Sequence, residues 1–436
     1  MKLSIYNSFI AIDKKNALLY NAKVDKFIIL TQPAIKSYFK GANYICENNP
    51  ELFSQLQEIT AIIDDDTDEV LNLRKSIKDV VENDDLFELH INPTLDCNFN
   101  CWYCYEKHLK GSQMNTETIE ATKIFIKNTL VKKNLKNFHL SFLGGEPLLY
   151  YNRVALPIIN YCQDECEKKR ICLSIHFTSN GYLVNKHIIN DLSKRNTTFQ
   201  ITLDGDKNNH NKTRFLKDGQ GSYDKICNNI KELASQKVYI CLRINYTLQN
   251  IQSVFSIHDT FKDIPIESKK YIVIDFQRVW QDNENEDINN MLENNRLKLF
   301  RLFQNSGFKV SYHKIHNSAK VPCYADKRNN ILINYDGNVY SCTARNFTTD
   351  NSEGVLQADG SIKWISNKKE KRLASKFNRK ECQLCRIAPI CGGGCTQNAI
   401  ENAQNLGCLR GLNEQDIDKL ILERFEFMFI SNNEIV

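Results

Sequence analysis

Three cysteines lie close together in the segment Cys97-Asn-Phe-Asn-Cys101-Trp-Tyr-Cys104. Thiolates at such spacing are typical ligands of iron–sulfur clusters, and a 4Fe–4S cluster is closed by four of them. Three thiolates leave one iron without a protein ligand, and this iron can bind a substrate or a cofactor. The segment therefore predicts a reactive iron–sulfur site rather than an electron carrier.

A structural zinc site is the alternative interpretation of this segment. Zinc takes four ligands, usually supplied as two short-spaced pairs. His108 could be a fourth ligand, but three clustered cysteines fit the zinc pattern poorly. We therefore expect iron here.

The chain from Leu86 onward alternates short β-rich runs with helical stretches, as parallel βα units do. Six strands are predicted, at 86–92, 138–143, 172–178, 199–203, 238–246 and 271–276. The expected fold class is α/β, with these units forming a partial (β/α)6 barrel of the TIM type.

Polar motifs occur where these predicted strands end, and the cysteine segment follows the first strand. Loops that leave the C-terminal ends of parallel barrel strands share one face. The other candidate residues near this face are Gly144, Gly145, Glu146, Pro147, Ser179, Asn180, Asp204, Arg243 and Asn245. Taken singly, Asn-Gly and Asp-Gly are also ordinary turn sequences. Their common placement predicts a single active face.

Composition limits the class of protein. The chain has 436 residues, of which 42% are hydrophobic, so it can bury a full-sized core. Its net charge is +5 without a basic block, which argues against nucleic acid as a partner. Neither a signal peptide nor a membrane span is evident, and 16 cysteines indicate metal or redox chemistry in a reducing cytoplasm.

A second group of cysteines lies near the C-terminus. Its members are Cys323, Cys342, Cys382, Cys385, Cys391, Cys395 and Cys408. Seven thiolates exceed one four-ligand site, so two metal centres are predicted. Zinc is again the alternative for Cys382-x2-Cys385 taken alone.

The C-x3-C-x2-C segment followed by an aromatic residue resembles the radical S-adenosylmethionine (SAM) superfamily. This resemblance implies that Cys97, Cys101 and Cys104 hold a 4Fe–4S cluster whose open iron binds SAM. Reductive cleavage of SAM then gives a 5'-deoxyadenosyl radical. The Gly144-Gly145-Glu146-Pro147 turn is similar to the family's GGEP motif, in which the Glu and nearby carbonyls receive the ammonium group of SAM. The resemblance implies that this turn and Ser179, Asn180, Asp204, Arg243 and Asn245 bind SAM.

The seven C-terminal cysteines resemble the SPASM domain. Carried over from that family, the distal auxiliary 4Fe–4S cluster would be held by Cys382, Cys385, Cys391 and Cys408. The proximal one would be held by Cys323, Cys342 and Cys395, one thiolate short. The cofactors implied are therefore SAM and three 4Fe–4S clusters, reduced by a donor such as flavodoxin or ferredoxin.

The first 85 residues read as a few strands followed by helices, as in a winged-helix module. This arrangement resembles the precursor-recognition element of enzymes that modify ribosomally made peptides, although a structural cap is the alternative. The expected domains are 1–85 (recognition), 86–310 (radical SAM barrel) and 311–436 (SPASM). The implied function is hydrogen abstraction from a precursor peptide with a leader sequence, closing a carbon-carbon or thioether cross-link by net two-electron oxidation.

Three alternatives stay open. The enzyme could oxidise one Cys or Ser, as anaerobic sulfatase maturases do, or could epimerise a peptide. A non-enzymatic, zinc-binding scaffold that grips peptides is the alternative of another class.

Overall fold

The computed structural model describes residues 1–132, 134–282, 286–312, 319–404 and 407–431. These residues divide into two compact units. Unit 1 comprises Met1–Asn83, Lys314–Arg328 and Lys368–Val436, and unit 2 comprises Asp84–His313 and Asn329–Asn367. The units are described separately below.

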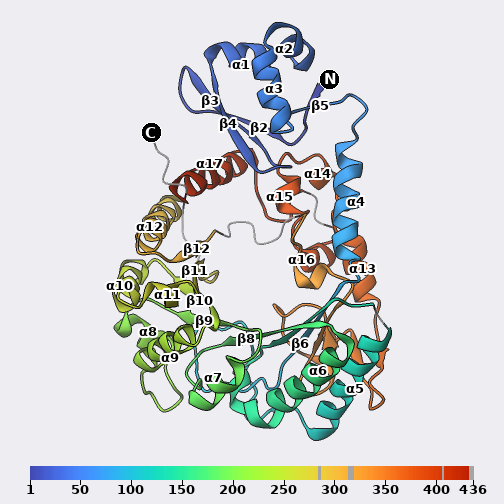
Figure 1. Ribbon diagram of the computed structural model, residues 1–436, viewed down its shortest axis with the longest axis vertical. Coiled ribbons are helices and arrows are strands. Elements are labelled where there is room, and N and C mark those ends of the chain that lie inside the picture. The colour runs from blue at the N-terminus through green and yellow to red at the C-terminus, as the bar shows by residue number, and fades with distance from the viewer. Residues whose placement is uncertain (133, 283–285, 313–318, 405–406, 432–436) are drawn as a thin grey trace. The chain divides into compact units, whose positions relative to one another are not determined.

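Unit 2 is built on a parallel sheet in which consecutive strands are neighbours (Figure 1). The six predicted strands are confirmed as β6 (Leu86–Ile91), β7 (Asn137–Phe142), β8 (Cys172–Ser179), β9 (Thr197–Leu203), β10 (Tyr239–Tyr246) and β11 (Ile272–Arg278). Each pairs in parallel with the next, for example Phe142 with Phe177. This parallel sheet gives the α/β fold that the sequence predicts.

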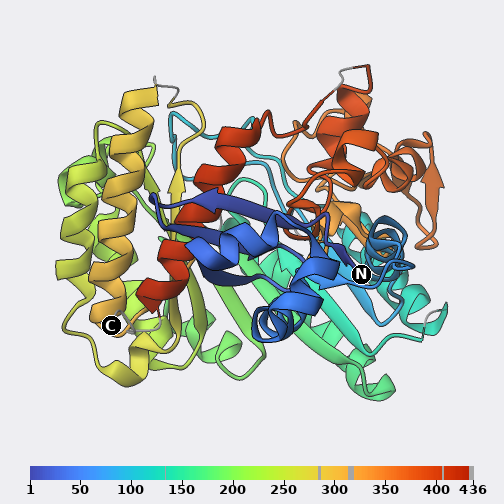
Figure 2. The same cartoon turned by 90° about the horizontal axis from the view of Figure 1, so that it is seen from above.

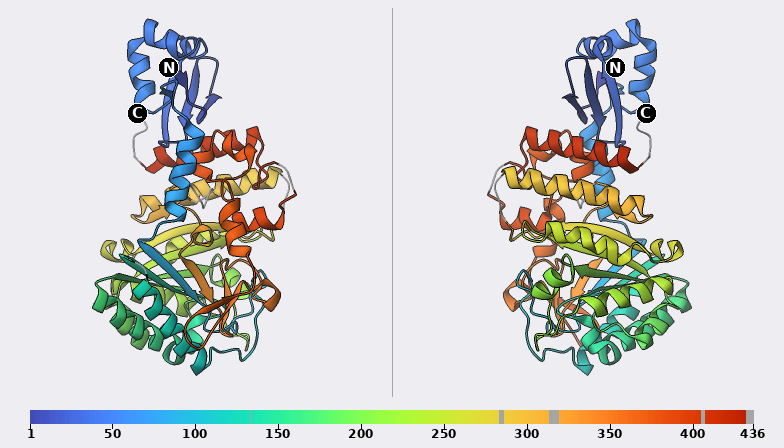
Figure 3. Two further views of the ribbon diagram at one scale, coloured as in Figure 1. Left: turned by 90° about the vertical axis from the view of Figure 1, so that its right-hand side faces the viewer. Right: turned by 90° about the vertical axis from the view of Figure 1, so that its left-hand side faces the viewer.

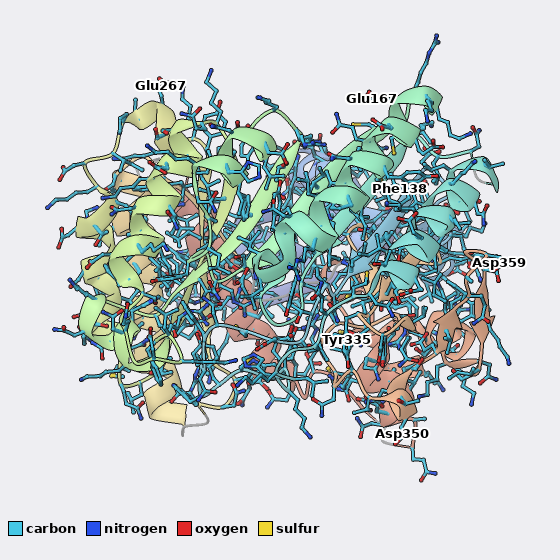
Figure 4. The ribbon with its side chains drawn as sticks, turned by 90° about the horizontal axis from the view of Figure 1, so that it is seen from below. Phe138, Glu167, Glu267, Tyr335, Asp350 and Asp359 are labelled. Atoms are coloured by element: carbon cyan, nitrogen blue, oxygen red, sulfur yellow. The ribbon has the colours of Figure 1, made fainter. Side chains whose placement is uncertain are left out.

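Helices cover the apolar face of this sheet. They are α5 (Thr116–Lys132), α6 (Leu156–Lys169), α7 (Lys186–Leu192), α8 (Lys207–Thr213), α9 (Tyr223–Ser235), α10 (Ile251–Phe261), α11 (Ile266–Lys269) and α12 (Glu286–Asn305). In Figure 4 several of them lie in front of the sheet, with Phe138 of β7 labelled among them. Phe142, Phe177 and Phe199 stack across neighbouring strands with ring centroids 5.0 and 5.3 Å apart, and all three are fully buried. Burial of this aromatic row holds the strands in register.

The sheet is wider than the sequence predicts. At one edge β12 (Lys309–Ser311) pairs in parallel with β11. At the other edge β13 (Asn330–Ile333) pairs in parallel with β6 and continues into the antiparallel strands β14 (Asn338–Tyr340), β15 (Gly354–Leu356) and β16 (Ile362–Trp364). Residues 329–367, expected to lie in a separate C-terminal domain, therefore extend the sheet of unit 2. The three-domain division itself stays a prediction.

The N-terminal part of unit 1 is a three-stranded antiparallel sheet with helices packed on it (Figure 2). Its strands are β2 (Asn7–Ala11), β3 (Asn16–Asn21) and β4 (Lys26–Thr31), and its helices are α1 (Gln32–Tyr38), α2 (Ala42–Asn48) and α3 (Pro50–Glu58). Leu19, Ile45, Leu52 and Leu56 form the shared core. Short strands β1 (Lys2–Leu3) and β5 (Ile62–Ile63) pair beside it, and α4 (Glu69–Val81) follows.

The C-terminal segment of unit 1 packs on this sheet. It contains a 3-10 turn, η3 (Tyr324–Asp326), and five helices, α13 (Lys368–Ser375), α14 (Lys380–Gln383), α15 (Ala388–Cys391), α16 (Thr396–Glu401) and α17 (Glu414–Ser431). Figure 3 shows α17 running alongside the three-stranded sheet. Tyr20 of β3 shares a core with Ile417 and Leu420 of α17, and Arg424 forms an ion pair with Asp25. Residues from both ends of the chain thus share one core.

No helix within the described ranges is long and apolar enough to cross a lipid bilayer.

Candidate active site

The cysteine loop (residues 92–115) connects β6 to α5 and carries Cys97, Cys101 and Cys104. The backbone N–H of Cys104 donates to the Cys101 carbonyl at 3.1 Å, and charge on Cys101 raises the pKa of both other thiols, so the three sulfurs are near neighbours. Burial is the larger effect and raises the pKa of Cys97 to about 12 and that of Cys104 to about 11. Thiolates at these positions need a nearby cation, which a metal cluster would supply.

The Gly144-Gly145-Glu146-Pro147 turn follows β7 and packs directly on the start of the cysteine loop. The N–H of Gly145 donates to the Thr94 carbonyl at 3.1 Å, and that of Glu146 donates to the Asp96 carbonyl at 2.8 Å. A Cβ at Gly145 would lie 2.1 Å from the Asp96 oxygen, and one at Gly144 would lie 2.5 Å from the Thr94 oxygen. Both glycines are therefore required for this backbone contact.

Glu146 is fully buried, and its carboxylate accepts three hydrogen bonds. The donors are the Leu148 N–H at 3.0 Å, the Ser179 hydroxyl at 2.9 Å and the Asn180 N–H at 2.8 Å. Desolvation raises the pKa of Glu146 to about 6, although these hydrogen bonds oppose the shift. The carboxylate joins the end of β7 to the end of β8. Pro147 begins the buried 3-10 turn η1 (Pro147–Tyr150) that follows.

Asn180 connects the end of β8 to the cysteine loop. Its side-chain NH2 donates to Asn98 Oδ1 at 2.8 Å and lies 3.9 Å from the sulfur of Cys97. Ser179 is buried beside it and also accepts the N–H of Gly181 at 3.0 Å. The structure therefore brings the predicted Ser-Asn pair against the first cysteine.

Asp204 follows β9, and Arg243 and Asn245 lie toward the end of β10; Asp204 and Asn245 contact the cysteine loop at Tyr103. The Tyr103 hydroxyl donates to Asp204 at 2.5 Å and accepts the Asn245 side-chain NH2 at 3.1 Å. Arg243 Nε donates to the Asn245 side-chain oxygen at 3.2 Å. These residues were expected to bind SAM, and that role stays a prediction. In the structure Asp204 and Asn245 contact Tyr103, which lies between two cysteines, whereas Arg243 contacts Asn245.

Two residues of this region were not among the predicted SAM contacts. Arg214, which follows α8, is buried and donates to the Tyr103 hydroxyl at 2.8 Å. Its charge lowers the pKa of Cys97, Cys101 and Cys104 and so opposes the effect of burial. Tyr103 itself could have been suspected because it lies within the C-x2-C spacing. The sequence gives no sign that a cation 111 positions away contacts it.

The donor set fits a thiolate-bound cluster beside an organic cofactor. Three thiols share one loop, a buried guanidinium favours their charged forms, and two buried atoms, Asp204 Oδ1 and Arg214 Nε, lack hydrogen-bond partners among the described residues. In the part of the chain that the structure describes, no three His, Cys, Asp or Glu side chains are grouped so as to hold a single metal ion.

Four of the C-terminal cysteines gather within unit 1. Burial, together with charge on Cys391, Cys408 and Cys385, raises the pKa of Cys382 to about 11, so the four thiols are close. Arg410 contacts two of them, with its Nε 3.4 Å from the sulfur of Cys391 and its backbone N–H 3.4 Å from that of Cys408. This is the set expected to hold the distal auxiliary cluster.

The other three C-terminal cysteines are divided between the units. Cys323 and Cys395 belong to unit 1, whereas Cys342 follows β14 in unit 2. Within unit 1, the buried side chain of Asp326, three residues after Cys323, connects the segments that carry Cys323 and Cys395. It pairs with Lys376 at 2.6 Å and accepts the hydroxyl of Thr396, the residue after Cys395. The assignment of these cysteines to a proximal cluster stays a prediction.

Comparison with known proteins identifies the central domain. Residues 91–263 match the Radical SAM superfamily. The chain is 24% identical over 370 residues to a cysteine-type anaerobic sulfatase-maturating enzyme of Clostridium novyi (strain NT), covering 77% of this chain and 92% of that protein. It is 25% identical over 366 residues to the radical SAM cyclopropyl synthase TigE of Paramaledivibacter caminithermalis, covering 75% of this chain and 71% of that protein.

Solved structures with the same fold include native anSMEcpe with bound AdoMet, at a TM-score of 0.61 and 18% identity over 80% of this chain and 99% of that one. Streptococcus suis SuiB bound to its precursor peptide SuiA matches at a TM-score of 0.51 and 17% identity, over 92% of this chain and 97% of that one. Residues 91–263 thus match the radical SAM family, and the chain shares the α/β fold of these structures.

Proposed function

We propose that this chain is a radical SAM enzyme that modifies a ribosomally made precursor peptide by closing a carbon-carbon or thioether cross-link. The observation that carries the proposal is the assembly of one face of unit 2. There the cysteine loop receives contacts from the Gly144–Pro147 turn and from the ends of β8, β9 and β10.

Each group of site residues would have its own task. Cys97, Cys101 and Cys104 would hold the cluster, while Ser179 and Asn180, fixed by the buried Glu146, would line the adjoining cofactor site. When bound, the cluster and SAM supply a 5'-deoxyadenosyl radical for hydrogen abstraction from the peptide. Cys382, Cys385, Cys391 and Cys408 would hold an auxiliary cluster that accepts the second electron, and a flavodoxin or ferredoxin would be the external donor.

The N-terminal part of unit 1 supports a peptide as the substrate. In the order β2-β3-β4, strand β4 is at an edge of its sheet, and Lys26 of β4 forms a salt bridge with Glu58 of α3 at 3.0 Å. A strand edge beside a helix suits an extended peptide that adds to the sheet. Ile29 of β4 is 52% exposed and could contact such a peptide. SuiB, which shares the fold, has been solved with its precursor peptide.

Oxidation of one Cys or Ser in a protein substrate is the second candidate. It is favoured by the similarity to the sulfatase-maturating enzyme, which extends over 92% of that protein. The two reactions differ in product, since a cross-link joins two residues whereas the maturase-type reaction changes one.

The deciding experiment is an anaerobic reaction of the enzyme with SAM, a reductant and a candidate precursor peptide, followed by tandem mass spectrometry. Loss of two hydrogens, with fragmentation suppressed between two residues, is the expected result. Loss of two hydrogens confined to one Cys or Ser would support the second candidate. An unchanged mass with deuterium uptake from solvent would indicate epimerisation and overturn the proposal.

A further inference from the structure

The Tyr103 hydroxyl is the meeting point of three elements of unit 2. It donates to Asp204 after β9, and it accepts hydrogen bonds from Arg214 after α8 and from Asn245 of β10. A phenol hydroxyl has one proton and two lone pairs, so these partners use its full capacity. The cysteine loop is thus fixed, between its second and third cysteines, to the ends of two strands.

Two of the three residues that hold Tyr103 are charged and buried. Asp204 is 2% exposed and Arg214 is 7% exposed. Interactions between buried charges are screened much less than those at the surface. The electrostatic effect of these two charges on the neighbouring thiols is therefore larger than that of a solvent-exposed pair.

The two charges act on the cysteines in opposite directions. The Arg214 guanidinium donates to the Tyr103 hydroxyl at 2.8 Å and lies 5.9 Å from the ring centre of Phe99, and the Asp204 carboxylate accepts the Tyr103 hydroxyl at 2.5 Å. A positive and a negative charge therefore both lie against the part of the loop that carries Cys101. A positive charge favours any state of the loop that carries more negative charge, and a negative charge disfavours it. Reduction of a thiolate-bound cluster adds one negative charge, so the same signs apply to its reduction.

The backbone of Arg214 is joined to that of Asp204 through two further side chains, Ser222 and His210. The Arg214 carbonyl accepts the hydroxyl of Ser222 at 2.5 Å, and that hydroxyl also contacts His210 Nε2 at 3.0 Å. His210 Nδ1 in turn accepts the backbone N–H of Asp204 at 3.3 Å. The backbones that carry the two charges are therefore joined independently of Tyr103.

From this geometry we infer that Arg214, Asp204 and Tyr103 are positioning residues that fix the cysteine loop and set the reduction potential of the cluster bound by Cys97, Cys101 and Cys104. Arg214 raises this potential and Asp204 lowers it. Asp204 and Asn245 then serve the loop rather than SAM. The inference rests on the proposed function for the presence of the cluster.

The test is an anaerobic redox titration followed by electron paramagnetic resonance, using the signal that changes when SAM is added. We expect Arg214→Gln to shift the midpoint potential to more negative values and Asp204→Asn to shift it to less negative values. Arg214→Lys keeps the positive charge, so its midpoint potential should be close to that of the wild type. Lys217→Gln is the matched control, because Lys217 also pairs with a residue of the cysteine loop, Asp96, but has a side chain that is 48% exposed. The shift in midpoint potential caused by Lys217→Gln should be smaller than that caused by Arg214→Gln or by Asp204→Asn.

Shifts of the same sign in both variants, or no shift, would overturn the inference. Absence of such a signal in the wild-type protein would instead count against the proposed function. The two failures are therefore distinguishable.

The anchoring role is tested separately in the full iron-free chain by hydrogen–deuterium exchange. Tyr103→Phe keeps the ring but removes the shared hydroxyl, so exchange in the peptide covering residues 97–106 should become several-fold faster. Tyr182→Phe, which keeps its ring 5.9 Å from that of Phe99 in the same loop, should leave this exchange unchanged. Equal exchange in Tyr103→Phe and wild type would refute the anchoring role.

Discussion

The backbone N–H of Asn180 donates to the carboxylate of Glu146 at 2.8 Å, and this bond joins the turn after β7 to the end of β8. Glu146 thereby fixes the residue whose side chain reaches toward Cys97. The carboxylate is in the protein interior, where each lost hydrogen bond leaves a donor without water to replace it.

Glu146→Gln should lower the free energy of unfolding of the iron-free protein by about 1–3 kcal/mol, because an amide NH2 cannot accept the bonds that a carboxylate oxygen accepts. Chemical unfolding followed by circular dichroism measures this. Glu167→Gln is the control, since Glu167 is exposed and its carboxylate accepts a hydrogen bond only at the surface of α6. Equal stability of Glu146→Gln and wild type would contradict the buried network.

The same pair of proteins gives a prediction for pH. The pKa of Glu146 is about 6 in the folded chain and 4.5 in its ordinary environment, so the folded state binds this proton more tightly. Stability from this group is therefore present at low pH and is lost as pH rises from about 4.5 to about 6. Relative to Glu146→Gln, the wild type should lose ~2 kcal/mol over this range. A constant difference would be the contradicting result.

Gly145→Ala should displace the cysteine loop, because its Cβ would lie 2.1 Å from the Asp96 oxygen. We expect a loss of more than about 2 kcal/mol in the free energy of unfolding and much weaker SAM binding, measured by calorimetry. Gly111→Ala is the control in the same loop, since no atom lies within 4 Å of its Cβ position, although its φ is +75°. Gly111→Ala should lower the free energy of unfolding by only about 1 kcal/mol. Similar effects of both changes would refute a role for close backbone contact.

Ile29→Asp should weaken binding of the precursor peptide about tenfold if β4 and α3 form the peptide site, with little change in stability because Ile29 is largely exposed. Fluorescence polarisation with a labelled precursor measures the affinity. Ile12→Asp, with 49% exposure near the end of β2 on the opposite edge of the sheet, should bind as the wild type does. If only Ile12→Asp weakened binding, the peptide site would lie at the other edge.

Lys376→Met should destabilise the protein by about 3–5 kcal/mol, because it leaves the carboxylate of Asp326 buried without its counter-ion. The two side chains are only 2% and 1% exposed. Adding Asp326→Asn to Lys376→Met should recover part of the loss, as thermal unfolding would show. A double variant that is less stable than Lys376→Met would mean that the ion pair is not the source of the effect.

The local alternation of β-rich and helical segments was enough to predict the six central strands of unit 2. All six predicted strands form, because each is a β-rich run between helical stretches. Strand β12 was missed since it has only three residues, and the pairing of β13 with β6 was missed because their paired residues, such as Leu332 and His90, are far apart in the chain. Pairings over such distances depend on tertiary packing and leave little mark on local sequence.

The site was predictable in its residue types and less so in its contacts. The cysteine spacing and the polar strand ends indicated which residues would meet. Their hydrogen-bond partners depend on side-chain burial, so the contacts of Asp204 and Asn245 with Tyr103 were not predicted, while their role in SAM binding stays a prediction. The same holds for Glu146, whose carboxylate is enclosed by Leu148, Ser179 and Asn180.

The most direct test of the central claim compares the wild-type protein with the triple variant in which Cys97, Cys101 and Cys104 are replaced by Ala. After anaerobic reconstitution, both are assayed for bound iron and for 5'-deoxyadenosine formed from SAM and dithionite. Cys172→Ala, which removes an exposed thiol at the start of β8, is the control and should behave as the wild type does. We predict that the triple variant loses about four irons per chain and all SAM cleavage. Continued SAM cleavage by the triple variant would contradict the account.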